Sequence, residues 1–188
     1  MSAPQIASDE ERDWLNTGES PDMLEAKLWA NPCPFTFRLN YLALLYNTPL
    51  YDWISDQHGL TRPEYVVLYS LALADGGSAR DVSQTSGFPK NTLSRAINRL
   101  EQLGLIRARS KAPGGRRKQA LYLSDKGWAL FNETRPAFEA QEKRMLKTLS
   151  QGERLILFEI MSKVVMAAQD WAGDLPAEAA ILKEGSRI

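Results

Sequence analysis

Apolar residues recur at helical spacing through residues 37–57, the first long segment that can bury one face. Pro49 falls inside this segment and should kink or restart the helix. Two prolines within residues 31–34 each restrict the residue that precedes them, so we expect a break there. Residues 1–35 are therefore predicted to form an extension before the helical body, in which Ser8–Glu11 and Ser20-Pro21 each favour the start of a short N-terminal helix.

Helix-start residues and glycine stops predict three shorter helices over residues 61–74, 78–86 and 89–103. In the third of these, Leu93, Ile97 and Leu100 fall on one face, which should be buried. A glycine separates the second helix from the third. This arrangement is typical of a helix-turn-helix.

Two alternating segments, residues 105–111 and 120–123, are joined by a proline and glycine turn and predict a β-hairpin. Two more helices should follow over residues 124–149, with a kink at Pro136, and over residues 150–171. The last helix is apolar around most of its girth and needs several neighbours to cover it. We interpret the excess as a subunit interface formed with the N-terminal helices.

The predicted fold is mainly α with a small β-hairpin. A winged helix-turn-helix, the DNA-binding domain, is expected over residues 61–127. A helical dimerisation domain is expected from residues 36–60 and 128–172. The acidic N-terminal extension, residues 1–35, and a C-terminal tail, residues 173–188, complete the chain.

Charged residues are segregated along the chain although the formal net charge is zero. Residues 1–36 hold seven acidic and two basic side chains. Residues 88–118 hold nine basic side chains and one acidic one, Glu101. A basic block in an otherwise neutral protein indicates a polyanion as partner.

The basic block combines a helix face with a hairpin, the two elements that a winged helix presents to duplex DNA. Arginine pairs with guanine and asparagine with adenine in the major groove, whereas basic residues of a hairpin hold phosphates or enter the minor groove. The predicted contacts on the helix are Lys90, Asn91, Thr92, Ser94, Arg95, Asn98 and Arg99, and those on the hairpin are Arg107, Arg109, Lys111, Arg116, Arg117 and Lys118.

Three strings resemble the MarR family of bacterial regulators: LTRPEYVVLYSLA, SARDVSQTSGFPKNTLSRAINRLEQLGLI and APGGRRKQALYLSDKGWAL. The resemblance covers residues 37–171. It implies a homodimer with intertwined first and last helices and one winged helix on each half of a palindromic operator. It also implies that Arg117 enters the minor groove. The family's wing usually reads Asp-x-Arg, but this chain has Gly115 at the aspartate position.

The resemblance also implies a repressor that a small aromatic or phenolic acid releases from DNA. Arg38, Tyr41, Tyr46 and Tyr65 are the candidate ligand contacts, since an arginine among tyrosines suits a carboxylate. Two alternatives remain open. One is a redox-sensing regulator that uses Cys33, and the other is a winged helix that serves protein interaction or DNA architecture without specific DNA recognition.

One cysteine and one histidine exclude a disulfide framework and leave too few ligands for a zinc site. Neither a phosphate-binding glycine loop nor a nucleophile elbow is present in the sequence, so we expect neither a cofactor nor enzyme activity. No apolar run is long enough to span a bilayer, and acidic residues occupy the place of a signal peptide. A cytoplasmic protein is therefore expected.

The wing assignment gives a direct test. Arg117→Ala should weaken operator binding about tenfold or more, the loss of roughly one groove contact. A gel-shift titration measures this affinity, and an unchanged affinity would refute the role of Arg117.

Overall fold

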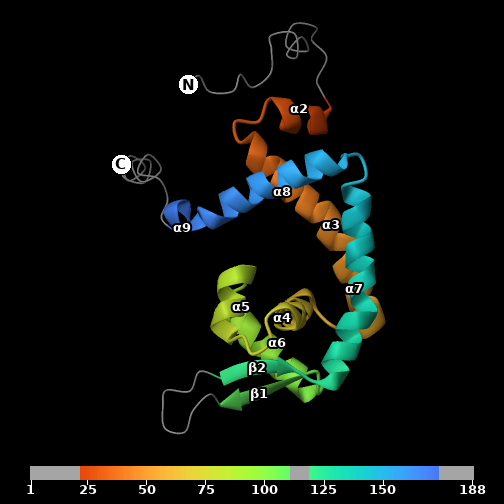
Figure 1. Ribbon diagram of the computed structural model, residues 1–188, viewed down its shortest axis with the longest axis vertical. Helices are drawn as coiled ribbons and strands as arrows, with labels where there is room; N and C mark the ends of the chain where they lie inside the picture. Colours follow the sequence, from red (N-terminus) through yellow and green to blue (C-terminus); the bar gives the residue numbers. More distant parts are fainter. Residues whose placement is uncertain (1–21, 111–118, 174–188) are drawn as a thin grey trace, which may run out of the picture. The chain divides into compact units, whose positions relative to one another are not determined.

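The computed structural model describes residues 22–110 and 119–173, and Figure 1 labels its elements. The chain divides into two compact units, Met1–Glu142 and Lys143–Ile188. The elements are α2 (Met23–Trp29), α3 (Pro34–His58), α4 (Arg62–Leu73), α5 (Ala79–Ser86), α6 (Lys90–Gln102), β1 (Ile106–Ser110), β2 (Gln119–Leu123), α7 (Asp125–Met145), α8 (Gln151–Met166) and α9 (Ala168–Trp171). The predicted fold class, mainly α with one β-hairpin, is confirmed.

Helix α3 runs through Pro49 without a restart, so of the two predicted outcomes, a kink or a restart, the restart does not occur. Proline inside a helix removes one hydrogen bond and crowds the preceding turn. The residues that follow supply a compensating gain, because Leu50 and Ile54 are buried in the core. Gly59, with φ of 63°, ends the helix as predicted.

Reciprocal capping bonds fix the start of α4, α5 and α8, as the sequence predicted. The backbone N–H of Thr61 donates to Glu64 at 2.7 Å, and that of Ser150 donates to Glu153 at 2.7 Å. The predicted ends of the last two helices need correction. Helix α7 stops at Met145, Ser150 takes an extended backbone as the cap of α8, and a turn at Ala167 separates α8 from α9.

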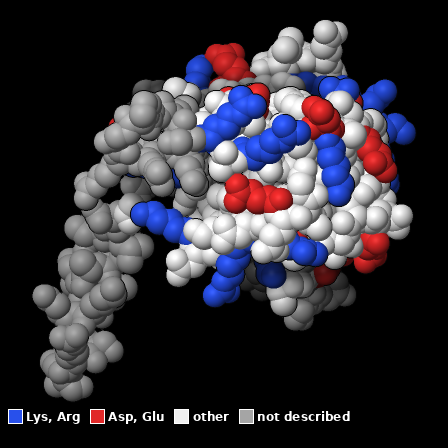
Figure 2. Space-filling model, turned by 90° about the horizontal axis from the view of Figure 1, so that it is seen from below, with Lys and Arg blue, Asp and Glu red and all other residues white. Residues whose placement is uncertain are grey.

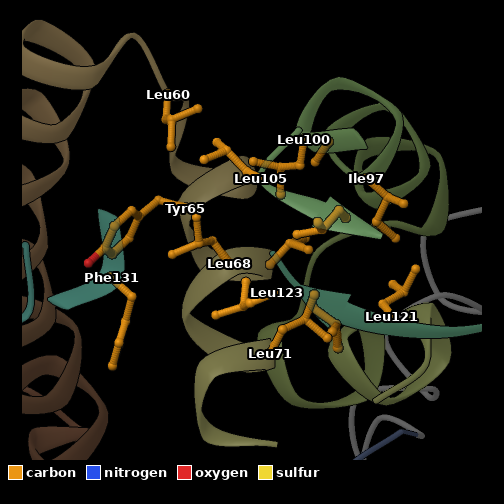
Figure 3. Close-up of a cluster of buried hydrophobic side chains, with 14 of the residues drawn as sticks. Leu60, Tyr65, Leu68, Leu71, Ile97, Leu100, Leu105, Leu121, Leu123 and Phe131 are labelled. Atoms are coloured by element: carbon orange, nitrogen blue, oxygen red, sulfur yellow. The ribbon is translucent and has the colours of Figure 1, made fainter. Parts of the chain in front are cut away.

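The core of the first unit lies between α4, α6 and the hairpin (Figure 3). Leu68 and Leu71 of α4 meet the buried stripe of α6, which includes Ile97 and Leu100. Leu121 of β2 is buried on the same side. The apolar face predicted for residues 89–103 is therefore the face that α6 buries.

Beside the hairpin, the segment between α4 and α5 adds further backbone pairing. Strands β1 and β2 pair antiparallel from Ile106 opposite Leu123 to Ser110 opposite Gln119. On the other side of β2, Gly76 N–H donates to the Leu121 carbonyl and Leu121 N–H donates to the Gly77 carbonyl, each at 3.0 Å. Gly76 has a φ of 80°, and the ring of Tyr122 leaves little room for a side chain there.

The start of α7 is bonded to the end of α6. The hydroxyl of Ser124 donates to the carbonyl of Gly104 at 2.6 Å and accepts from the N–H of Gly127 at 3.1 Å. The ammonium of Lys126 donates to the carbonyl of Leu103 at 3.0 Å. A Cβ at Gly127 would overlap the backbone carbonyl of Leu105, so only glycine fits. The string Ser-Asp-Lys-Gly thus joins α6, β1 and α7.

In the second unit, α8 has no buried residue. Leu155, Ile156 and Phe158 are all exposed in this chain. No helix within residues 22–110 and 119–173 is both long and apolar enough to cross a membrane.

Gly127→Ala should lower the free energy of unfolding by about 3 kcal/mol, because the new methyl group must displace backbone. Chemical denaturation measures the loss. Gly152→Ala is the matched control: among the described residues nothing lies within 4 Å of its Cβ position, and it sits in the first turn of α8. It should be neutral or stabilising by up to about 1 kcal/mol. Equal stability of Gly127→Ala and the unchanged protein would contradict the close approach.

Candidate nucleic-acid interface

Helix α6 presents its polar side chains to solvent because its apolar stripe is held in the core. Leu93, Ala96, Ile97 and Leu100 are buried. Among the predicted contacts, Lys90, Asn91, Ser94, Arg95, Asn98 and Arg99 are exposed and Thr92 is half-buried. All the predicted contacts on the helix thus share its outer side.

The N-terminus of α6 suits an anion. Pro89 is the N-cap and makes no side-chain capping bond, and the first turn contains no acidic residue. The N–H groups at this end and the helix dipole favour negative charge, and Lys90 adds a cation at the first position. This end of the helix can therefore hold a phosphate.

The hairpin contributes two further cations. Arg107 and Arg109 are two positions apart on β1, so they point to the same face, and both are exposed. The guanidinium of Arg109 lies 5.5 Å from the ring centroid of Tyr122. The remaining predicted contacts, Lys111, Arg116, Arg117 and Lys118, lie outside the described residues.

Figure 2 shows the side of the first unit on which α6 and the hairpin lie, seen from below the view of Figure 1. Lys and Arg side chains gather across this face, with acidic side chains among and around them. Among the described bases of the block, Lys90, Arg95, Arg99, Arg107 and Arg109 are all exposed.

A groove of about 540 Å³ separates α5 from α6, and sequence reasoning missed the cation on its α5 side. Arg80 of α5 and Lys90 of α6 both line it. Its other lining residues are Ala79, Ser83, Gln84, Leu93 and Ser94. Arg80 lies eight positions before the basic block begins, so charge counting alone did not include it.

A second missed cation is Arg62, at the start of α4. Its guanidinium lies 5.0 Å from the ring centroid of Tyr51 and 5.9 Å from that of Phe88. Phe88 directly precedes the cap of α6. The contact between positions 51, 62 and 88 exists only in the folded chain.

Two predicted ligand contacts, Tyr46 and Tyr65, belong to one aromatic cluster around Phe138 of α7. Tyr65 is fully buried and stacks on Phe138 at a centroid distance of 5.0 Å. The hydroxyl of Thr134 donates to the Leu130 carbonyl, so the Tyr65 phenol, 2.7 Å away, donates to Thr134. Tyr46 donates to the carbonyl of Phe138 at 3.3 Å. Burial raises the pKa of both phenols to about 12.

The other two predicted ligand contacts lie nearer the start of α3. Arg38 donates to the carbonyl of Pro34 at 3.0 Å and lies 5.3 Å from the ring centroid of Trp29. Tyr41 stacks on Phe37. Arg38 and Tyr46 are eight positions apart, which is about 12 Å along a helix. The structure joins Tyr46 to Tyr65 through Phe138, but it does not bring Arg38 into that cluster.

Within residues 22–110 and 119–173, His, Cys, Asp and Glu side chains form no group of three that could hold a metal ion.

Comparison with known proteins places this geometry in a family. Residues 58–118, which span the helix-turn-helix and part of the hairpin, match the model of the MarR family. Residues 58–118 are a MarR-family domain. The resemblance inferred from the sequence strings is confirmed for this domain.

Similar proteins extend the match beyond the MarR-family domain. The chain is 28% identical over 160 residues to the HTH-type transcriptional regulator PecS of Dickeya dadantii (strain 3937), across 84% of this chain and 91% of PecS. A MarR-family regulator from Silicibacter pomeroyi has a similar fold, with a TM-score of 0.67 and 23% identity over 82% of this chain and all of that one.

A third similar fold is that of the MarR-family protein Rv2887 of Mycobacterium tuberculosis, solved in complex with salicylic acid. The TM-score is 0.57 at 20% identity, and the match covers 72% of this chain and 98% of that one. The fold that surrounds the MarR-family domain in this chain is thus shared with solved regulators.

The buried phenols predict how stability depends on high pH. The pKa of Tyr65 in the folded chain is about 12, above the ordinary value of 10.0, so folding holds its proton. The stability that this provides is fully present below pH 10 and is lost as pH rises from about 10 to 12. Tyr65→Phe should therefore lose less stability than the unchanged protein over this range.

Urea unfolding at several pH values between about 8 and 12 measures the slope. Tyr41→Phe serves as the control, because Tyr41 stacks on Phe37 outside the cluster. The same pH dependence for Tyr65→Phe and the unchanged protein would count against a proton held by burial.

Proposed function

We propose that this protein is a sequence-specific, duplex-DNA-binding regulator of transcription that acts as a homodimer on a palindromic operator in the cytoplasm. The observation that carries the proposal is the exposed face of α6. Its polar and basic side chains project together, its N-terminus has no acidic residue, and β1, which carries the exposed Arg107 and Arg109, packs beside α6.

The proposed complex has two kinds of contact, those that recognise bases and those that hold the DNA backbone or enter the minor groove. Asn91, Thr92, Ser94 and Arg95 lie in the first turns of α6 and meet base edges in the major groove. Arg80 and Lys90 flank the groove between α5 and α6 and hold a backbone phosphate there. Arg107 and Arg109 hold phosphates beside the hairpin, and Arg116 and Arg117 anchor the wing in the minor groove.

Exposed apolar side chains support the dimer. On α3, Phe35, Leu39 and Leu42 recur at helical spacing and are between 42% and 48% exposed. Taken separately, α8 exposes Leu155 and Ile156 at 63% and 58%. Apolar surface on this scale marks an interaction site in a water-exposed protein. A second copy of the chain that covers these faces fits the two-fold symmetry of a palindromic site.

The regulator is proposed to be a repressor that a small aromatic acid releases. The relative solved with salicylic acid supports this class of effector. Arg38, Tyr41 and Tyr46 remain the proposed ligand contacts. The ring and hydroxyl of Tyr65 are engaged in the core, so we assign Tyr65 the role of shaping the adjacent wall.

Two alternatives make different predictions. Cys33 is exposed and caps the start of α3, the position from which a redox-sensing regulator would work. A winged helix with an architectural role would bind duplex DNA through phosphates alone.

Selection of bound sites from random duplex tests the proposal. A palindromic consensus is expected, bound about 10³-fold or more tightly than random duplex at physiological salt. Recovery of duplex without a consensus would support the architectural alternative. Addition of salicylate to the selected complex, with a matched peroxide treatment of a Cys33→Ser variant, separates the two modes of release.

Two substitutions on neighbouring helices separate base recognition from phosphate binding. Arg95→Ala should weaken binding to the selected site by about 10- to 100-fold and relax the preference at one position of each half-site. Arg80→Ala should weaken binding to selected and random duplex alike and reduce the salt dependence by about one phosphate per subunit. Fluorescence anisotropy over a salt series measures both. If Arg95→Ala lost the same affinity for selected as for random duplex, the role of Arg95 in base recognition would be contradicted.

A further inference from the structure

Arg62 occupies a position that helix electrostatics disfavour. It is the first residue of α4, where the helix dipole is positive and acidic side chains are preferred. It is also exposed, and a cation there lowers the stability of an isolated helix. Contacts outside α4 must therefore offset the unfavourable interaction of this charge with the helix dipole.

Two aromatic rings supply those contacts. The guanidinium lies 5.0 Å from the centroid of Tyr51 on α3 and 5.9 Å from that of Phe88, within the range of cation–π attraction. Burial raises the pKa of the Tyr51 phenol, and the charge and hydrogen bond of Arg62 oppose that rise. The charge of Arg62 thus acts on the Tyr51 phenol as well as on its ring.

Packing within the first unit fixes the position of the Tyr51 ring. Its ring meets Tyr65 of α4 and Phe138 of α7 edge-on, at centroid distances of 6.3 and 6.0 Å. Tyr65 and Phe138 stack on each other in the core. Three helices therefore determine where the Tyr51 ring lies.

Phe88 sets where α6 begins. It precedes the cap residue Pro89, and its ring is half-buried against the core. Its backbone is held twice: the Ser83 hydroxyl donates to its carbonyl, and its N–H donates to the Ser86 hydroxyl, each at 3.3 Å. A displacement of Phe88 would move the first turn of α6 with it.

We propose that Arg62 is a positioning residue for DNA recognition, which ties Phe88, and with it the first turn of α6, to Tyr51 of α3. The consequence for DNA binding rests on the function proposed above. In this role Arg62 acts through α6 and need not touch DNA. A basic side chain near a DNA-binding face has an obvious alternative role, direct contact with a phosphate, and the experiment must distinguish the two.

The first measurement compares Arg62→Met with Arg135→Met on selected and random duplex. Arg62→Met keeps an apolar stem but removes the cation, and should reduce the preference for the selected site by about 5- to 30-fold with an unchanged salt slope. Arg135→Met removes the same charge from an exposed pair with Glu139 and should leave both values unchanged. A smaller salt slope with equal loss on both duplexes would make Arg62 a phosphate contact and overturn the proposal.

A double substitution tests the route through Phe88. If Arg62 works by holding Phe88, the combined Arg62→Met and Phe88→Leu variant should lose no more preference for the selected site than the single variant with the larger loss. Losses that multiply would mean that the two residues act independently, which contradicts the proposal.

Hydrogen exchange of the free protein tests the placement without DNA. The Leu93 N–H bonds the Pro89 carbonyl at 3.1 Å and closes the first turn of α6. In Arg62→Met this amide should exchange about tenfold faster, whereas the Leu105 N–H, bonded to Leu100, should not change. Unchanged exchange at Leu93 overturns the placement. Faster exchange without a duplex consensus would leave the placement standing and reject only the proposed function.

Discussion

The close approach of α7 to the backbone of Leu105 constrains the whole winged helix. Because Gly127 has no side chain, the first turn of α7 comes near enough for Ser124 and Lys126 to bond the carbonyls of Gly104 and Leu103, which follow α6. The same contact fixes where β1 leaves α6. The helix that presents polar side chains and the strand that presents Arg107 and Arg109 therefore share one anchor, and their relative placement follows from it.

Burial then decides which side of α6 meets solvent. Four apolar residues turn inward, and the remaining positions of the helix are exposed, apart from the half-buried Thr92. The desolvation of that stripe stabilises the fold, whereas the outward face contributes little to stability and is free to serve recognition. Because the buried stripe supplies the stability, α6 can be firmly packed although its outer side is polar.

Sequence patterns predicted what depends on neighbours along the chain. The capping boxes at Thr61 and Ser150 and the buried stripe of α6 involve residues three or four positions apart, so their signals are local. Pro49 does not restart the helix, one of the two outcomes predicted for it, because the cost of proline is local but the burial of Ile54 that offsets it is not.

The remaining differences also come from tertiary contacts. Tyr65 finds its hydroxyl partner, Thr134, 69 positions away, which no local pattern reveals. Arg62 and Arg80 lie before the basic block, and only the packing of α4 and α5 brings Arg62 to Phe88 and Arg80 to the groove beside α6. Candidate contacts on α6 were thus identifiable from the sequence, whereas the side chains that support α6 were not.

The pairing of Gly76 and Gly77 with β2 has a consequence for solubility. It satisfies backbone groups on the outer side of β2, which leaves β1 as the edge of this small sheet. Unprotected edges recruit strands from other molecules, and charged side chains discourage such pairing. The charges of Arg107 and Arg109 therefore also discourage aggregation. An apolar replacement of both would leave an edge strand that can pair with β1 of another molecule.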